Sequence, residues 1–359
     1  MTLNTYQLDL FKKVTQIYAI SGQESDLARF LSQAYQGLGF ELVRDNLGSV
    51  FALKKSKIKQ ALKVMVAGHM DEVGFIIIDI KENGMIALDP VGGINPQTLL
   101  AHRVMTKTKF GTFLEGSIDA VPPHLMNEAD REKPVQIANM LVDFGFRSKA
   151  EAIEKGLYIG AMTVVKGEFV PLNDGKRLLS KAFDNRYGVV LGLDIANEIK
   201  DIELPYDLYI GATVQEEVGL RGATTISQMI EPDFAIVLDC SPARDSTGDN
   251  EQEGQLGGGV LLRYTDKSML SFRNLIMYQE KMCEANGVKS QYYSSPGGTD
   301  AGAIHKANQG VLTLTHCICA RNIHTCSSII DSDDYLGARK VLLAILKDFN
   351  QERYQSLRK

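Results

Sequence analysis

The spacing of apolar residues near the start of the chain predicts an amphipathic helix. Apolar residues recur there at the three- and four-residue intervals of one helix face: Leu8, Phe11, Val14, Ile17 and Tyr18. Charged residues such as Asp9 and Lys12 interrupt the apolar run, so we do not expect a signal peptide. The segment Ser21–Glu24 has the sequence of a capping box and predicts the start of a second helix through 27–34.

Short apolar runs typical of β-strands follow, and a turn at 46–48 separates the first two. From about residue 72 to 160, β-rich pieces alternate with Gly, Pro and Asn, and one helix is predicted behind a second capping box at 148–151. Beyond about residue 162, helices and strands alternate. Outside the β-rich segment we predict strands at 40–44, 50–53, 62–67, 208–214, 234–239 and 311–317, and later helices at 186–199, 272–285 and 334–349.

This order of elements predicts an α/β fold. Strands that alternate with helices form a mainly parallel sheet, here expected to be mixed, with helices on both faces. The β-rich segment interrupts that pattern, so we interpret it as an inserted second domain. We therefore divide the chain into residues 1–70 and 162–359 as one domain and residues 71–161 as the insertion. The length of 359 residues, well above one usual domain, agrees with this division.

Composition and charge argue against several classes of function. The chain has 39 basic and 44 acidic residues, a formal net charge of −5, so it lacks the basic excess of a nucleic-acid-binding protein. No apolar run approaches the ~18 residues of a membrane span, so we expect no membrane association. Five cysteines, an odd number without an export signal, indicate a reducing compartment, and we expect a cytoplasmic protein.

Several familiar catalytic motifs are absent from the sequence. It contains no H-E-x-x-H, no G-x-S-x-G, no G-x-x-x-x-G-K-[ST] and no G-x-G-x-x-G. These absences argue against a zincin protease, an α/β-hydrolase, a P-loop enzyme and a classical dehydrogenase.

Histidines and acids instead follow the apolar strands. His69 and Asp71 come directly after the strand predicted at 62–67. In an extended segment these two side chains point the same way, so a carboxylate is expected beside the imidazole, as it often is for metal-binding histidines. Taken alone, the H-x-D spacing is more simply interpreted as a polar pair at the end of a strand than as a metal site.

Other acids and one histidine occupy similar positions. Glu216 and Glu217 follow one predicted strand, Asp239 closes another, Asp184 opens a helix, and His324 lies beyond the last strand. Open α/β sheets bind ligands at the carboxyl ends of their strands, where these residues could converge. A cluster of carboxylates repels itself unless cations neutralise it, so the group as a whole favours a metal site.

Five segments in this order resemble the signature blocks of a known family. They are 67–75 (AGHMDEVGF), 182–186 (AFDNR), 215–222 (QEEVGLRG), 298–301 (GTDA) and 321–325 (RNIHT). They look like those of the dinuclear metalloaminopeptidases that form tetrahedral dodecamers, the family that includes glutamyl aminopeptidase. The resemblance covers essentially the whole chain.

The resemblance implies a fold, a metal centre and an assembly. The inserted domain would be a β-barrel-like dimerisation domain, and dimers would build a homo-oligomeric dodecamer that admits short peptides. Two divalent ions per subunit, zinc or cobalt or else manganese, would be bound by five residues, with Asp184 bridging: His69, Asp184 and Asp239 for one ion, and Asp184, Glu217 and His324 for the other.

The resemblance also implies roles in the reaction. Glu216 would be the general base and Asp71 would orient His69. The peptide bond between Asp184 and Asn185 would be cis. These roles describe an aminopeptidase, an exopeptidase that removes N-terminal residues from short peptides.

One position bears on specificity. Many relatives carry Glu four residues after the last histidine, where this chain has Ser328, as in the glutamyl-selective branch. We therefore expect a preference for N-terminal Glu and Asp, with Arg321 and Lys267 as candidate cationic partners. The alternatives are a broad or Leu-preferring aminopeptidase of the same family, a paired-carboxylate glycosidase, which would leave His69 and His324 unexplained, and a non-catalytic assembly protein.

Overall fold

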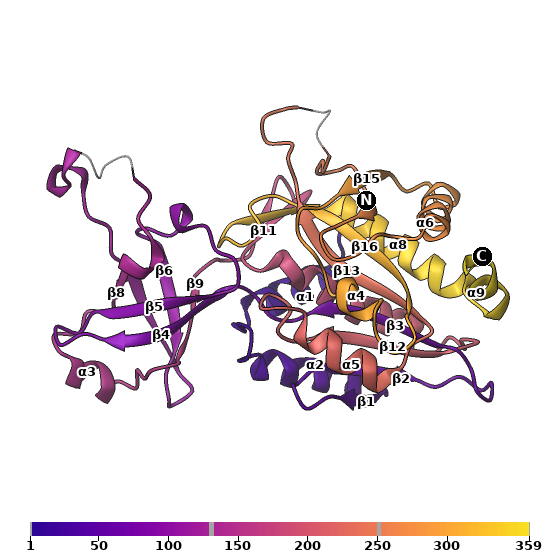
Figure 1. The fold of residues 1–359 in the computed structure, drawn as a ribbon, viewed down its shortest axis with the longest axis horizontal. Coiled ribbons are helices and arrows are strands. Elements are labelled where there is room, and N and C mark those ends of the chain that lie inside the picture. Colours follow the sequence, from indigo (N-terminus) through magenta and orange to yellow (C-terminus); the bar gives the residue numbers. More distant parts are fainter. Residues whose placement is uncertain (1, 129–132, 250–252, 359) are drawn as a thin grey trace.

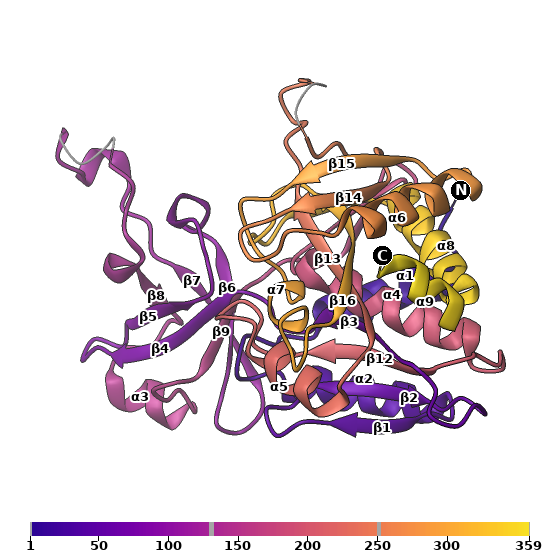
Figure 2. The ribbon, with the colours of Figure 1, turned by 45° about the vertical axis from the view of Figure 1, so that its right-hand side comes forward.

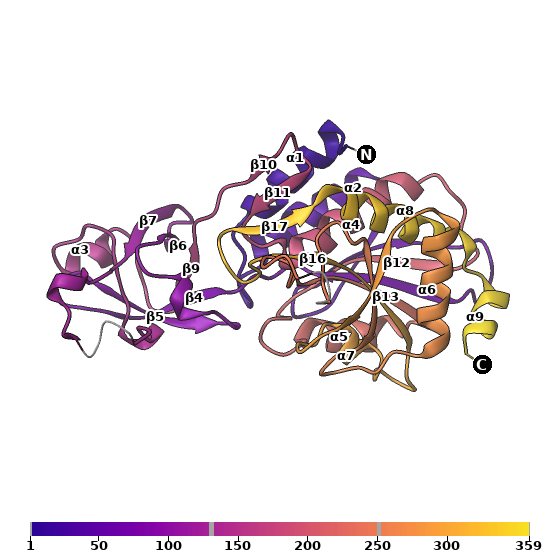
Figure 3. The ribbon, with the colours of Figure 1, turned by 90° about the horizontal axis from the view of Figure 1, so that it is seen from above.

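The computed structural model describes residues 2–128, 133–249 and 253–358. Figure 1 shows a larger part built of a sheet and helices beside a smaller β-barrel, and the view from above in Figure 3 shows the two side by side along the long axis. No helix among the described residues is both long and apolar enough to cross a membrane.

An eight-stranded sheet forms the centre of the larger part, in the order β1-β2-β12-β3-β13-β16-β14-β15. The four middle strands are mutually parallel, whereas β1, β2 and β14 introduce antiparallel pairs towards the edges. The strands are β1 (Glu41–Arg44), β2 (Val50–Lys54), β3 (Lys63–His69), β12 (Asp207–Thr213), β13 (Phe234–Pro242), β14 (Val260–Thr265), β15 (Ser290–Ser294) and β16 (Leu312–Ala320).

Helices cover both faces of this sheet, as Figure 2 shows, because successive strand residues point in opposite directions. In β3, Val64 and Val66 pack into the core with α1, α2, α4, α6 and α8, whereas Met65 and Ala67 pack against α5 and α7. The helices are α1 (Thr5–Gln16), α2 (Ser25–Gly37), α4 (Phe183–Ile199), α5 (Arg221–Ile230), α6 (Arg273–Ala285), α7 (Ala301–Ile304), α8 (Ser332–Asp348) and α9 (Gln351–Leu357). The predicted α/β class and its mixed sheet are confirmed.

The smaller part is a closed six-stranded barrel with the order β4-β5-β8-β7-β6-β9 and its own apolar core around Phe75, Ile77 and Val104. Its last strand lies beyond residue 161, so the barrel ends at Val165. The barrel elements are β4 (Gly74–Ile80), β5 (Ile86–Val91), β6 (Arg103–Lys107), β7 (Phe113–Ile118), β8 (Leu141–Asp143), the helix α3 (Lys149–Glu154) and β9 (Met162–Val165).

A small antiparallel sheet of three strands lies where the chain leaves the barrel, in the order β10-β11-β17. Its strands are β10 (Val170–Leu172), β11 (Arg177–Ser180) and β17 (Ser328–Asp331). The middle strand β11 pairs with β17, which opposes Ser180 to Ser328. This pairing fixes the loop that carries His324 against the start of α4.

The two predicted capping boxes have different outcomes. Ser148 does cap α3, because its side chain accepts a hydrogen bond from the backbone of Glu151. The box at Ser21–Glu24 is wrong: α2 begins at Ser25, and its N-cap residue Glu24 makes no side-chain cap. The hydroxyl of Ser21 donates instead to Asp71, and the Glu24 carboxylate accepts from the backbone of Gly22.

Candidate metal centre and active site

The candidate metal ligands and the candidate base named from the sequence lie at the edge of the sheet where the parallel strands end. His69 is the last residue of β3, and Glu216 and Glu217 follow β12. Asp239 lies within β13 at the point where its pairing with β3 has stopped at Val237, so the two strands leave room between them. Such an opening between neighbouring parallel strands is where α/β sheets usually bind ligands.

Asp184 reaches this edge because α4 approaches β3 very closely. A Cβ atom on Gly68 would lie 3.0 Å from the backbone of Gly188, so glycine is required for this approach. The Asp184–Asn185 peptide bond is cis, which confirms the prediction. The Asn185 amide then anchors the start of the helix, donating to the Leu238 carbonyl at 2.7 Å and accepting from the Gly188 N–H at 3.0 Å.

Two histidines face the two oxygens of Asp184. His69 Nε2 lies 3.1 Å from Asp184 Oδ1, and His324 Nε2 lies 3.2 Å from Asp184 Oδ2. The other ring nitrogen of each histidine is held by a backbone carbonyl, that of Asp71 at 3.1 Å and that of Gly93 at 2.7 Å. A carbonyl only accepts, so each Nδ1 carries the proton, and each Nε2 is either a second N–H or a lone pair facing a cation.

The remaining carboxylates complete three clusters whose possible ligand atoms lie within 4.8 Å of one another. These are His69–Asp184–Asp239, Asp184–Glu217–His324 and His69–Glu216–Glu217. Glu217 Oε1 is buried and has no hydrogen bond, although His324 Nε2 is 3.3 Å away. A pair of bound cations would satisfy this buried carboxylate oxygen, which has no hydrogen bond. The same cations would satisfy the two imidazole nitrogens, whose nearest partners are carboxylates.

Burial and crowding perturb the ionisation of these groups. Burial raises the pKa of Glu216 well above its usual value, although His69 opposes the shift. Burial, reinforced by the charge of Asp184, likewise raises the pKa of Asp239. For His324, burial alone would lower the pKa, but Asp184 and Glu217 outweigh it and raise the pKa to about 11. The site therefore favours positive charge among its carboxylates.

Asp71 makes further contacts besides the expected one with His69. Its carboxylate Oδ1 is 3.6 Å from His69 Nδ1, and the closer contact to this nitrogen is the Asp71 backbone carbonyl. The carboxylate also accepts the N–H groups of Glu216 at 3.0 Å and Glu217 at 3.1 Å. It therefore holds the two adjacent glutamates as well as neighbouring the histidine.

An open cleft of about 890 Å³ leads to the centre. The cleft is lined by His69, Asp184 and His324 and also by Lys267 and Lys306. Neither lysine has an ion-pair partner within the described parts of the chain, so both leave positive charge free to act in the cleft.

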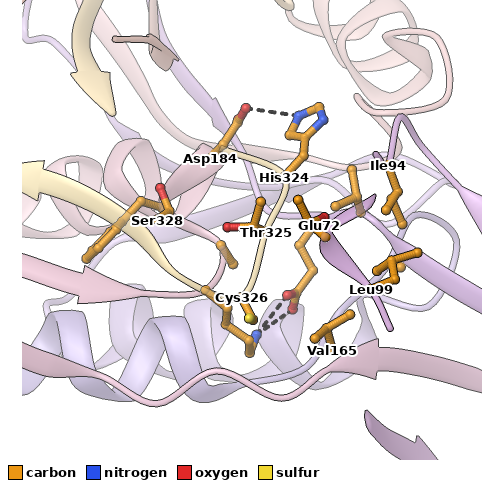
Figure 4. Close-up of a pocket in the computed structure, with 15 residues that line it drawn as sticks. Glu72, Ile94, Leu99, Val165, Asp184, His324, Thr325, Cys326 and Ser328 are labelled. Atoms are coloured by element: carbon orange, nitrogen blue, oxygen red, sulfur yellow. Dashed lines mark hydrogen bonds and ion pairs between the residues drawn. The ribbon is translucent and has the colours of Figure 1, made fainter. Parts of the chain in front are cut away.

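Two residues considered for specificity lie elsewhere. Arg321 does not line the cleft, because Asp245 binds its guanidinium at 2.7 and 2.8 Å. Ser328 is buried and donates to the Arg321 carbonyl at 3.0 Å. It lines a smaller pocket beside Asp184 and His324, shown in Figure 4, rather than the open cleft.

The smaller pocket lies between the sheet edge and the barrel. Figure 4 shows Ile94, Leu99 and Val165 of the barrel part on one side and the strand with Ser328 on the other. Inside it, the Lys181 ammonium binds both oxygens of Glu72, at 2.7 and 2.8 Å. This buried ion pair, which also includes Arg186 of α4, lies just before the chain enters the barrel at Gly74 and lines the same pocket as Asp184 and His324.

Sequence reasoning missed one buried acid behind the site. Asp300 is 1% exposed, one of its oxygens contacts the hydroxyl of Thr213 very closely, and the other has no partner. Burial raises the pKa of Asp300 to about 6. The block 298–301 contains this residue, and the presence of an acid inside a signature block was the available signal.

Comparisons with known proteins find relatives that match almost the whole chain. The family model of the M42 glutamyl aminopeptidases matches residues 48–341. The glutamyl aminopeptidase of Lactococcus lactis subsp. cremoris (strain MG1363) is 38% identical over 355 residues, which cover 98% of this chain and 99% of that protein.

Solved structures are similar over the whole chain. The TET aminopeptidase of the marine sediment archaeon Thaumarchaeota archaeon SCGC AB-539-E09 has a TM-score of 0.93 and 32% identity, covering 98% of this chain and 99% of that one. The Pyrococcus horikoshii TET1 peptidase, described as able to assemble into a tetrahedron or a large octahedral shell, has a TM-score of 0.86 and 28% identity, covering 96% and 100%. The chain therefore belongs to the M42 glutamyl aminopeptidase family and is a hydrolase that acts as an exopeptidase.

Proposed function

We propose that this protein releases N-terminal residues, preferentially Glu and Asp, from short peptides at a centre of two divalent metal ions. The observation that carries the proposal is the bridging position of Asp184, whose two oxygens each face the Nε2 of a different histidine. Carbonyls hold the opposite nitrogens of both rings, so the two Nε2 atoms are directed at one carboxylate.

Five residues would hold the ions. His69, Asp184 and Asp239 form one set, and Asp184, Glu217 and His324 form the other. Imidazole and carboxylate ligands suit zinc, cobalt or manganese. When bound, such a pair of ions lowers the pKa of water and polarises the scissile carbonyl.

Glu216 is the general base of the proposed reaction. Its side chain is 12% exposed at the base of the cleft, beside both ligand sets but outside them. Its carboxylate takes a proton from the attacking water and delivers it to the leaving amine. Asp71 keeps Glu216 and Glu217 in place through their backbone N–H groups.

The preference for acidic residues rests on the charge of the cleft. Lys267 and Lys306 line it, without acidic partners in the described ranges 2–128, 133–249 and 253–358. Arg263, only 2% exposed, donates to the Ser241 hydroxyl and is paired with Asp266, which balances its charge, so the preference rests on the two lysines. A substrate carboxylate entering the cleft would be attracted by these cations.

We also propose a homo-oligomer, a dodecamer built from dimers through the barrel, in the cytoplasm. The tetrahedral shell described for the Pyrococcus horikoshii TET1 peptidase supports the assembly. Five free cysteines, four of them buried, support a reducing compartment.

One experiment tests the proposed function against its alternatives. Metal content is measured, and Glu-, Asp- and Leu-anilides and a polysaccharide are assayed before and after treatment with a chelator. We expect two divalent ions per chain and chelator-sensitive release of the N-terminal residue. Chelator-resistant cleavage of the polysaccharide would indicate a glycosidase, and inactivity with every substrate would indicate an assembly protein.

A further inference from the structure

Three consecutive backbone N–H groups of the loop that carries the proposed base are bound by two buried carboxylates. Gln215 N donates to Glu24 Oε1 at 3.1 Å, Glu216 N donates to Asp71 Oδ1 at 3.0 Å, and Glu217 N donates to Asp71 Oδ2 at 3.1 Å. Glu24 is 5% exposed and Asp71 is fully buried. These hydrogen bonds have ordinary lengths, but their acceptors are buried and bind three successive positions, so together they restrict the loop.

The loop needs such partners because its backbone leaves the strand abruptly. Gln215 has a φ of +55°, in the left-handed region that residues other than glycine seldom adopt. β12 ends at Thr213, so the following N–H groups have no neighbouring strand to pair with. Buried N–H groups outside a sheet require side-chain acceptors, and the two carboxylates provide them.

The segment before α2 supplies half of this arrangement. The Ser21 hydroxyl donates to Asp71 Oδ2 at 2.6 Å, and Glu24 Oε1 also accepts from Gly22 N at 2.8 Å. The side chains of Ser21 and Glu24 therefore do not cap α2. They connect the start of α2 to the loop of the proposed base. The contact between Glu24 and Gln215 joins residues that are 191 positions apart in the sequence.

We propose that Glu24, supported by Ser21, is a positioning residue for Glu216. Ser21, Glu24 and Asp71 together form what we call the carboxylate cradle, which orients the backbone that carries the Glu216 side chain. This inference rests on the proposed function, because it assumes that Glu216 transfers the proton. Glu24 itself contacts neither the ligand sets nor the cleft of the metal centre. It acts through the backbone of the loop.

The chemistry of Glu24 indicates which substitution should be tolerated. One oxygen accepts both N–H groups, from Gly22 and from Gln215. Burial raises the pKa of Glu24 to about 7, helped by the charge of Asp71 and opposed by the N–H donors. A side chain with one accepting oxygen and no charge, such as Gln, can therefore replace it, whereas Ala cannot.

The test compares Glu24→Ala, Glu24→Gln and a matched control. Asp26→Ala removes a carboxylate of the same helix turn that faces Lys107 and Arg29 and makes no contact with the loop. kcat, KM, metal content and thermal unfolding are measured for each. We expect Glu24→Ala to lower kcat by about 10- to 100-fold with KM and both metal ions retained, because small errors in placing a catalytic group are costly. Glu24→Gln should recover most of kcat, and Asp26→Ala should behave like the wild type.

A double variant identifies the residue through which Glu24 acts. If the cradle serves Glu216, adding Glu24→Ala to Glu216→Gln should cause little further loss. An equal further loss would overturn the inference, as would unchanged kcat in Glu24→Ala, loss of metal from it, or failure of Glu24→Gln to recover activity. If Glu24→Ala does not fold, Ser21→Ala decides: a lower kcat at unchanged KM supports the cradle, and wild-type kcat overturns it. Near wild-type activity in Glu216→Gln alone would instead contradict the proposed function.

Discussion

Replacing Glu216 by Gln tests whether this residue moves a proton or binds a metal ion. Glu216 and Glu217 are adjacent, but they face different partners. Glu217 Oε1 lies 3.3 Å from His324 Nε2, whereas Glu216 Oε2 lies 3.9 Å from His69 Nε2. Asp184 is closer to both histidines, at 3.1 and 3.2 Å, so each ligand set is complete without Glu216.

The expected loss follows from these contacts. Gln keeps nearly the size of Glu and both backbone contacts of the loop, so substrate binding and the two ligand sets should persist. Only the proton acceptor disappears, which typically lowers the rate by about 10²–10⁴. At about 1.36 kcal/mol for each factor of ten, this is about 3–5.5 kcal/mol of activation free energy. The loss should appear in kcat rather than in KM.

The assay measures kcat with a Glu-anilide and counts metal ions per chain by mass spectrometry. Glu217→Gln is the matched control, because it removes the same charge one residue away but from a ligand. This substitution should weaken the binding of one ion, and excess metal should partly restore the activity of the variant. Asp184→Asn should disturb both ions together, because Asp184 belongs to both sets.

Two results would refute this assignment. Glu216→Gln with near wild-type kcat would show that another group accepts the proton. Glu216→Gln with a missing ion would make Glu216 a ligand, and the cluster of His69, Glu216 and Glu217 would then be the relevant set.

Three further predictions follow. Glu72→Gln should lower the free energy of unfolding by about 3–5 kcal/mol in denaturant titrations, because Lys181 and Arg186 would remain buried without their shared anion; a change below about 1 kcal/mol, as for an exposed pair, would contradict this. Glu-anilide should be cleaved with a higher kcat/KM than Leu-anilide, and Lys267→Ala or added salt should narrow the difference; an equal or higher value for Leu in the wild type would refute the acidic preference. Sedimentation should show a large assembly, and a species of about 40 kDa at all concentrations would exclude it.

The strands of the sheet could be predicted because burial on both faces makes them continuously apolar. β3 and β13 are examples, since residues on alternate sides pack into different cores. α5 could not be predicted, because its N-cap Leu220 adopts a left-handed conformation and provides no capping side chain. β14 and β15 were missed as well, and they lie at an edge where Tyr264 and Tyr292 are exposed and the apolar pattern is broken.

For the candidate site, the sequence predicted the metal-ligand candidates but not the contacts that support them. The ordered blocks identified the residues that the structure brings together, such as His69, Asp184 and His324. The supporting contacts could not be predicted, because they join segments distant in sequence and involve residues without a recognisable motif. Glu24 had the local sequence of a helix cap, and only the folded chain reveals that its partner is the backbone of Gln215.

The barrel holds His324, one of the proposed ligands at the edge of the sheet, in place. The ring is held by the carbonyl of Gly93, in the segment between β5 and β6 of the barrel, 231 positions away. The barrel backbone can come this close because of glycine: a Cβ on Gly92 would lie 2.7 Å from a methyl of Val73 and 3.3 Å from the Cβ of Glu217. A side chain at position 92 would push the barrel away from Glu217, a proposed ligand, and displace the Gly93 carbonyl that fixes the ring of His324. The inserted barrel therefore contributes directly to the geometry of the candidate metal centre, whatever part it also plays in assembly.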